Sequence, residues 1–470
     1  MSESFNTKMS LLADAIRDKS GISGQLTLND MCQAVTSIQK YPDYYLCTNI
    51  GSDTWTGTKL VKGSSGEYNT TGDPISDLTY TGKAPEVGSI YTIDASVKVD
   101  VPLVMDVVRV YSTGLNANDQ CGLGSTVDAE KIYSLHCIPG NIKFKQIASY
   151  MHSIGIDTDG KMWVVGSNSS GYLGLGSTSK ATKFTKLSDK TWSYAAVCAY
   201  VTAAIDTEGK LWVCGKNTSS NMGISESTSY IVKTFTDTNL SNIVAVDVSN
   251  SHMIAVDASG NLYVTGKNTY GELVTGDKTT RMLFTNIGKP VYNGTELHIV
   301  DVKCGGNYTI LRDSNGYLYS CGYNKYGQLG NNTKTDSTAL CRVMDSADAT
   351  EHVRKYKKMS AGYSHVLALD EDDYLWVWGS AGNYRTFTGS SAANATPVNP
   401  SSMQCICACA GYDQSMAITL DGDLMVTGTS TNGQLGVGTG SSLINRIKLG
   451  ADKWYNLGDT KRYTHFAWKA

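Results

Sequence analysis

A glycine recurs along this chain at nearly constant intervals, and this repeat constrains the fold more than any other feature. The series runs through Gly114, Gly166, Gly215, Gly266, Gly322, Gly379 and Gly428. Subtracting each position from the next gives steps of 52, 49, 51, 56, 57 and 49 residues. A period near 50 residues is typical of a solenoid, a propeller or an array. Much of the 470-residue chain is therefore predicted to form one repeat array.

Each repeat has a segment of fixed length ahead of its glycine. Fourteen residues before the last six glycines stand His152, Val201, His252, Tyr308, His365 and Gln414, which we call the anchors. Eight residues after each anchor comes a glycine, or Asp373 in the fifth case. Apolar and polar residues alternate on both sides of this turn, as in "IGIDTDGKMWVVG". Such a pattern around an Asp-Gly turn predicts a β-hairpin, and a rigid hairpin explains the constant offset.

Four short strands in each unit of about 50 residues suit a propeller blade. Gly114 has the glycine-rich loop after it but no hairpin turn before it, and His465 lies where a seventh anchor is due. We therefore expect residues 460–470, with His465, Phe466 and Trp468, to pair with residues 107–113 and close the ring. Removing the last ten residues should destabilise the whole ring, because two sheet edges would stay open.

The segments "HVLALDEDDYLWVWG", "GYNKYGQLG" and "GTSTNGQLG" resemble the repeat of the regulator-of-chromosome-condensation family of β-propellers. The resemblance covers residues 100–470 and implies an all-β, seven-bladed propeller closed by the C-terminal strand. Two repeats depart from the family pattern. The segment "GSAGNYRTFTG" after Gly379 lacks the glycine loop, and in the repeat of Gly266 the eighth-place glycine is replaced by Val274. Many members of this family act on small GTPases, chromatin or ubiquitin transfer, so the resemblance implies a regulatory protein that binds a protein partner.

Residues 1–40 differ in kind from the repeats. Their apolar positions predict a short helical hairpin that serves as an attachment or oligomer interface, formed by Leu11, Leu12, Ile16, Met31, Val35 and Ile38. A unit this small rarely folds alone. The stretch "LADAIRDKSG" resembles the opening of many bacteriophage tail and fibre proteins. DNA binding is a rival hypothesis, but no cluster of Arg and Lys supports it. Residues 41–98 are predicted to form a small β adaptor, and residues 99–470 the propeller.

Histidines and cysteines invite a metal hypothesis, which the repeat argues against. His152, His252, His365 and His465 occupy equivalent positions in different blades, so they are too far apart to share one ion. We expect each to be buried and to bond to a neighbouring blade. Cys405, Cys407 and Cys409 should lie on one face of a strand as small core residues. An asparagine two places after most of the repeat glycines should bond to its own loop. No motif for an enzyme, a cofactor or a metal stands out, so none is expected.

The net charge of −3 gives no general attraction to nucleic acid, and no apolar run is long enough for membrane insertion. Together with the phage-like opening, the many Ser, Thr, Asn, Gly and Tyr residues favour a bacteriophage virion structural protein of the tail-fibre or receptor-binding type. It would assemble in the host cytoplasm, contact other tail or baseplate proteins through its N-terminal segment, and form a homo-oligomer.

In this hypothesis the propeller binds a glycan or protein of the host surface. The candidate contacts lie in the two longest connections and are Tyr292, Asn293, His352 and Arg354. Two alternatives stay open, namely the regulatory protein-binding propeller and a head or collar decoration protein. A glycan-cleaving enzyme would need two placed carboxylates, and the sequence indicates no such pair.

Overall fold

The computed structural model describes the backbone of the strands between residues 44 and 92. It also describes residues 109–469, apart from 125–128, 141, 188–189, 228–229 and 345–353. The chain divides into two compact units, Met1–Val108 and Arg109–Ala470. The predicted helical hairpin, with Leu11, Leu12, Ile16, Met31, Val35 and Ile38, lies outside the described residues, so the attachment segment and its boundary at residue 40 stay predictions.

The first unit contains a four-stranded antiparallel sheet in the order β5-β2-β1-β6. Its strands are β1 (Tyr44–Ile50), β2 (Thr54–Lys59), β5 (Pro74–Thr79) and β6 (Ile90–Thr92). A second, two-stranded sheet pairs β3 (Val61–Lys62) with β4 (Tyr68–Asn69). All six strands lie within residues 41–98, which the sequence predicts to be a small β module.

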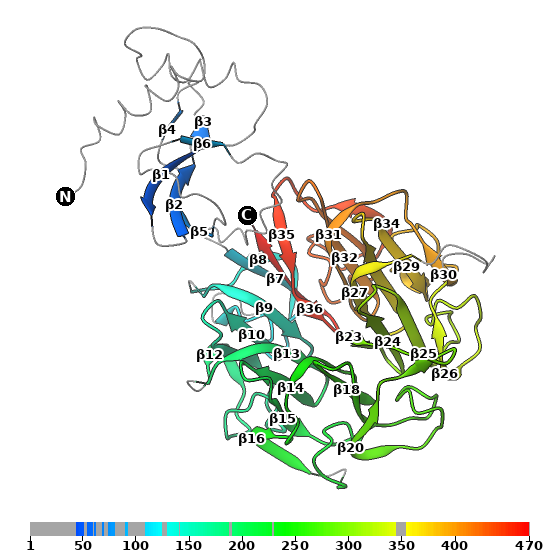
Figure 1. Cartoon of the computed structure of the whole chain (residues 1–470). Coiled ribbons are helices and arrows are strands. Elements are labelled where there is room, and N and C mark those ends of the chain that lie inside the picture. The colour runs from blue at the N-terminus through cyan, green and yellow to red at the C-terminus, as the bar shows by residue number, and fades with distance from the viewer. Residues whose placement is uncertain are drawn as a thin grey trace. The chain divides into compact units, whose positions relative to one another are not determined.

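The second unit is a seven-bladed β-propeller, as predicted (Figure 1). Each blade is a four-stranded sheet whose first strand lies nearest the axis. The first three blades are β9 (Phe144–Ser149), β10 (His152–Asp157), β11 (Met162–Gly166) and β12 (Ala181–Lys186); β13 (Trp192–Val197), β14 (Val201–Asp206), β15 (Leu211–Lys216) and β16 (Ile231–Asp237); and β17 (Ile243–Val248), β18 (His252–Asp257), β19 (Leu262–Gly266) and β20 (Arg281–Gly288).

Three more blades continue the ring in chain order. They are β23 (Ile299–Cys304), β24 (Tyr308–Asp313), β25 (Leu318–Gly322) and β26 (Ser337–Arg342); β27 (Tyr356–Ala361), β28 (His365–Asp370), β29 (Leu375–Gly379) and β30 (Asn394–Val398); and β31 (Cys405–Ala410), β32 (Gln414–Thr419), β33 (Leu424–Gly428) and β34 (Leu443–Lys448). The hydrophobic core lies between successive blades, and the second strand of each of these six blades is almost entirely buried.

The seventh blade is built from both ends of the propeller. Its order is β35 (Trp454–Leu457), β37 (Thr464–Lys469), β7 (Arg109–Leu115) and β8 (Lys131–Cys137). In Figure 1 the red strands therefore lie beside the cyan ones. β37 pairs with β7 over six positions, from Thr464 opposite Gly114 to Lys469 opposite Arg109. The predicted closure by the C-terminal strand is confirmed. The Trp468 indole also donates to the carbonyl oxygen of Phe144, which ties the closing blade to the first.

An aspartate at the end of the second strand explains why the hairpins are so regular. Asp206 accepts hydrogen bonds from the backbone amides of Glu208 and Lys210 and from the Trp212 indole at 2.8 Å. Asp157 with Trp163, and Asp370 with Trp376, repeat the indole bond at the same distance. The spacing of six residues between the carboxylate and the indole thus fixes the turn.

The loop asparagines and the repeat glycines have structural roles, as expected. Asn168 donates to the carbonyl oxygens of Ser177 and Ser179 and accepts from the Leu173 amide. Gly215 has a φ of +116°, and a Cβ there would lie 2.0 Å from the carbonyl oxygen of Tyr200. Only glycine fits such a close approach at positive φ. The abundance of Asn and Gly therefore follows from the loops that hold each blade together.

The prediction that Cys405, Cys407 and Cys409 share one face of a strand is wrong for Cys405. A β-bulge between Cys405 and Cys407 shifts the register against β32. Because a one-residue slip reverses the side to which a side chain points, Cys405 packs on one side of the sheet and Cys407 on the other. Every blade has a bulge between its two innermost strands. The cysteines of the described residues are all free.

The buried histidines link neighbouring blades, which confirms the structural interpretation. Nε2 of His152 lies 2.8 Å from the Thr202 hydroxyl, and that of His252 lies 2.9 Å from the Thr309 hydroxyl. His365 contacts Ser415 in the same way, and His465 contacts Gln414. Burial lowers the pKa of His152, and likewise of His252 and His465, from 6.5 to about 3. These rings are therefore neutral in the folded protein at ordinary pH.

Acidification should destabilise the propeller through these histidines. Below about pH 6.5 the unfolded chain takes up protons that the folded chain accepts only near pH 3. Because the unfolded state binds more protons in this window, the free energy of unfolding falls with pH, by up to about 1.4 kcal/mol per pH unit for each histidine. Urea unfolding at pH 7.5, 6.5 and 5.5 measures the slope. His365→Gln, which copies the residue of the next blade, should reduce it, and an unchanged slope would contradict this explanation.

Candidate functional site at the mouth of the axial channel

The loops between the first and second strands of the blades gather at one end of the propeller axis. In six blades these loops have two or three residues, whereas in the seventh the loop spans residues 458–463. This longer loop contains β36 (Asp459–Thr460), which pairs in parallel with β9, and the Lys461 amide then donates to Ser149. Figure 1 places β36 near the middle of the ring. The loop therefore occupies the axial channel.

Lys461 crosses the channel and fixes this loop. Its ammonium group lies 2.6 Å from a carboxylate oxygen of Asp247 and donates to the Cys304 carbonyl oxygen at 3.0 Å. Asp247 is buried and also accepts from the Cys304 amide at 2.6 Å. The ion pair joins the closing blade to the third and fourth blades. In the same loop, a carboxylate oxygen of Asp459 accepts from the Tyr194 hydroxyl at 3.4 Å.

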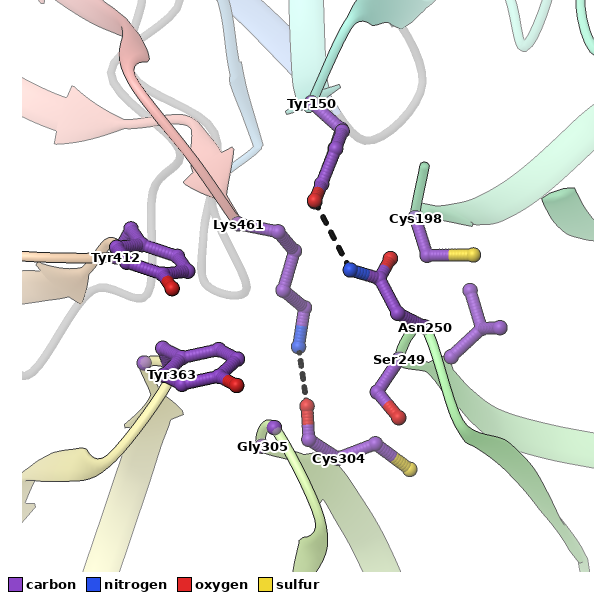
Figure 2. Close-up of a pocket in the computed structure, with 12 residues that line it drawn as sticks. Tyr150, Cys198, Ser249, Asn250, Cys304, Gly305, Tyr363, Tyr412 and Lys461 are labelled. Atoms are coloured by element: carbon purple, nitrogen blue, oxygen red, sulfur yellow. Dashed lines mark hydrogen bonds between the residues drawn. The ribbon is translucent and has the colours of Figure 1, made fainter. Parts of the chain in front are cut away.

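Above Lys461 lies a pocket that encloses about 350 Å³ together with its open mouth. Every blade contributes to it, as Figure 2 shows for most of the lining residues: Tyr150, Cys198, Ser249, Asn250, Cys304, Gly305, Tyr363, Tyr412 and Lys461. Asn250 donates to the Tyr150 hydroxyl at 2.9 Å. A second pocket lies on the other side of the loop and includes Tyr194, Lys303 and Asp459. Lys461 lines both pockets, so the loop divides the channel.

Tyrosines line one arc of the mouth. The rings of Tyr363 and Tyr412 stack with centroids 4.4 Å apart, and Tyr463 meets Tyr412 edge-on at 5.6 Å. The guanidinium group of Arg462 lies over the rings of Tyr463 and Tyr150, 5.1 and 5.4 Å from their centroids. Tyr363 is 43% exposed. The mouth thus presents aromatic faces and one guanidinium group to solvent.

The thiols of the pocket are poor nucleophiles. Burial raises the pKa of Cys198 to about 11, and it raises that of Cys304 well above the ordinary value of 9.0. Both groups are therefore protonated thiols at neutral pH. Across the described ranges, no three His, Cys, Asp or Glu side chains come together as a metal site requires. Within the same ranges, no helix has the length and apolar character needed to cross a lipid bilayer.

Three of the contact residues expected from the sequence, Tyr292, Asn293 and Arg354, lie in connections from the last strand of one blade to the first strand of the next, and not in the mouth loops. Tyr292 and Asn293 belong to a small hairpin of β21 (Val291–Tyr292) and β22 (Thr295–Glu296), between the third and fourth blades. The Tyr292 ring packs 5.2 Å from that of Tyr319. Arg354 lies 3.3 Å over the Trp376 ring and 3.4 Å from Asp370. His352 lies outside the described residues. A binding role for these four residues stays a prediction.

The mouth residues were missed at the level of sequence. Tyr150, Tyr363, Tyr412 and Tyr463 each stand two places before an anchor. This constant spacing from the anchors is the signal in the sequence that marks them. Lys461 and Arg462 belong to a segment, "GDTKRY", without any apolar alternation. Only the closed ring reveals that this segment enters the channel.

The geometry defines a β-propeller scaffold whose channel is filled by its own chain and whose accessible groups lie on its end surfaces. A family model of the RCC1-like domain matches residues 109–454. The chain belongs to this family.

Three curated proteins illustrate the relationship. The ultraviolet-B receptor UVR8 of Arabidopsis thaliana is 25% identical over 70% of this chain and 63% of its own length. The secretion-regulating guanine nucleotide exchange factor of Bos taurus is 30% identical over 37% of this chain and 38% of its own. The human regulator of chromosome condensation is 27% identical over 38% of this chain and 41% of its own length. This chain spans less than two thirds of each.

Solved structures share the fold at low identity. Human WBSCR16 superposes with a TM-score of 0.67 and 16% identity, over 77% of this chain and all of that protein. Prp20p of Saccharomyces cerevisiae superposes with a TM-score of 0.64 and 16% sequence identity, over 78% of this chain and 92% of Prp20p. At these identities the likeness concerns the fold alone.

The virion hypothesis from the sequence is wrong. The relatives are cellular receptors, exchange factors and regulators rather than tail-fibre components. The expected bacteriophage partners, host-surface glycan and virion location are wrong for the same reason. The low-charge composition misled the interpretation, because its Asn and Gly residues serve the loops of the repeat. The phage-like opening lies outside the described residues. The expectation that the chain is not an enzyme is supported only in part, because its relatives include a guanine nucleotide exchange factor and nucleotide exchange is a catalysed process.

Proposed function

We propose that this chain is a regulatory protein whose propeller binds a protein partner. The observation that carries the proposal is the filled channel: Lys461 and β36 block the axis, so the accessible polar and aromatic groups face outward at its mouth. A surface of tyrosine and arginine suits protein recognition, since these residues are enriched at binding hot spots.

The relatives support a partner from the GTP-binding proteins. The bovine relative is an exchange factor for guanine nucleotides, and yeast Prp20p has been studied for its binding properties to Gsp1p and histones. Exchange requires no nucleophile or metal in the propeller. A protein that binds the nucleotide-free form of a GTPase more tightly than the loaded form must lower the affinity of that GTPase for its nucleotide, by linkage.

A direct test uses the full chain and a panel of purified small GTPases, Gsp1p included, each loaded with a fluorescent GDP analogue. We expect one member to release its nucleotide at least tenfold faster with the chain than alone. The same chain should bind that GTPase in its nucleotide-free state by calorimetry. A heat-denatured sample of the same chain serves as the inactive control. Absence of both binding and acceleration across the panel would count against a GTPase partner.

A further inference from the structure

Among the described residues, Arg462 is the charged residue of the mouth loops whose side chain contacts aromatic rings instead of a hydrogen-bonding or ion-pair partner. Four charged residues occur in these loops, namely Asp413, Asp459, Lys461 and Arg462. The Asp413 carboxylate forms a salt bridge with the Arg385 guanidinium group, with nitrogen and oxygen 2.6 Å apart. The Lys461 ammonium group forms one with the Asp247 carboxylate, also at 2.6 Å. Asp459 faces the Tyr194 hydroxyl and Gln146. Among the described residues, the Arg462 guanidinium contacts tyrosine rings and no carboxylate.

The tyrosines hold this guanidinium group in a fixed setting. It lies over two rings, Tyr150 and Tyr463, and the second ring belongs to the Tyr363–Tyr412–Tyr463 stack. The Arg462 carbonyl oxygen accepts from the Tyr412 amide, which anchors the backbone. A planar guanidinium group with its orientation restricted loses little entropy when it forms a two-pronged bond with a carboxylate.

Two lysines add positive charge at the mouth on the second and third blades. Lys216 and Lys267 each follow a repeat glycine, and their amides donate to the mouth loops at Tyr200 and Ser251. Lys267 is exposed, and neither ammonium group has a carboxylate partner within the part of the chain that the structure describes. The mouth therefore has two lysines and the exposed Tyr200 on the second and third blades, and Arg462 among the tyrosines of the fifth to seventh.

We propose that this mouth is the binding site for an acidic segment of the protein partner. This inference rests on the proposed function and adds the chemistry of the partner. Arg462 binds a carboxylate, and Tyr363 and Tyr412 pack against the planar groups beside it. Nucleic acid fits less well, because one guanidinium and two lysines neutralise few phosphates. A second copy of the chain also fits less well, since a two-fold contact would bring equal positive charges together.

The test uses a fluorescein-labelled peptide of ten alternating Glu and Tyr residues and the full chain, followed by fluorescence anisotropy at two salt concentrations. We expect binding that weakens with salt, and a loss of at least tenfold in affinity for Arg462→Met. Arg462→Lys keeps the positive charge but cannot donate two parallel N–H bonds to one carboxylate, so its affinity should lie between those of the parent chain and Arg462→Met. Lys186→Met, at an exposed lysine of β12, is the matched control and should bind like the parent chain. Thermal unfolding shows that each variant is folded.

Three results would overturn the proposal. These are no binding of the Glu-Tyr peptide, equal affinity of Arg462→Met and the parent chain, or tighter binding of a ten-residue Lys-Tyr peptide or a thymidine decanucleotide. Light scattering in the same samples checks for a dimer that Arg462→Met abolishes, which would assign the mouth to a second copy. GTPase binding is measured separately, so a chain that binds a GTPase but ignores the acidic peptide retains the proposed function and loses only this inference.

Discussion

A chain that stops at Tyr463 should fail to form a closed propeller and should be recovered as aggregate. The deletion removes β37, which lies between β35 and β7 and pairs with both. Phe466, Ala467 and Trp468 are each buried to 1% exposure. Losing one buried tryptophan or phenylalanine side chain costs about 3–5 kcal/mol, and each ladder bond adds about 1 kcal/mol. The sum is comparable to the whole stability of a domain, about 5–15 kcal/mol.

Graded variants make this prediction quantitative. Trp468→Ala alone should lower the free energy of unfolding by about 3–5 kcal/mol, since it leaves a cavity and removes the bond to Phe144. Lys469→Ala removes a half-exposed ion pair with Asp452 and a contact with the Tyr111 ring, and it should change the urea midpoint far less than Trp468→Ala. Soluble yield and urea unfolding measure both. A soluble, cooperatively unfolding chain that ends at Tyr463 would show that closure by β37 is dispensable.

Breaking the ion pair across the channel should have the next largest effect. Lys461→Met leaves the Asp247 carboxylate buried, at 3% side-chain exposure, with the Cys304 amide as its remaining partner. Removing one member of a buried ion pair costs about 3–5 kcal/mol, because the other charge stays without compensation. We therefore expect a loss of that size in urea unfolding at pH 7.

The double variant Asp247→Asn/Lys461→Met separates charge from packing. It removes the buried charge and keeps an oxygen for the Cys304 amide, so at least half of the lost stability should return. The control is Lys453→Met, which breaks an exposed contact with Asp423 and should change little. If the double variant is no more stable than Lys461→Met, the lysine stabilises the loop by packing rather than by its charge.

The repeated parts of the fold could be predicted from the sequence because they follow local rules. An Asp-Gly turn between alternating residues determines a hairpin, and its constant length reveals the anchors. The same count placed His465 in the closing blade, where it contacts Gln414. Blade symmetry also argued correctly against a shared metal site, because His152, His252, His365 and His465 stand in four different blades.

The candidate site could not be predicted in the same way. Residues 458–463 enter the channel only because seven blades surround an axis, and no local pattern in "GDTKRY" reports this. The Lys461–Asp247 pair joins positions 214 residues apart. Cys405 was misplaced because a bulge leaves no trace in an alternating pattern. The mouth tyrosines do have a signal in the sequence, because each stands two places before an anchor.

The composite seventh blade also affects how the protein is made. Thr464 bonds to Leu115 across 349 positions of the chain. At ribosomal speeds of about 5–20 residues per second, roughly 20–70 seconds pass between the synthesis of these two residues. Throughout that interval one edge of β7 lacks its partner strand, so we expect the nascent chain to be prone to pairing with its neighbours on a polysome, and slower translation of the later blades to lengthen this exposure.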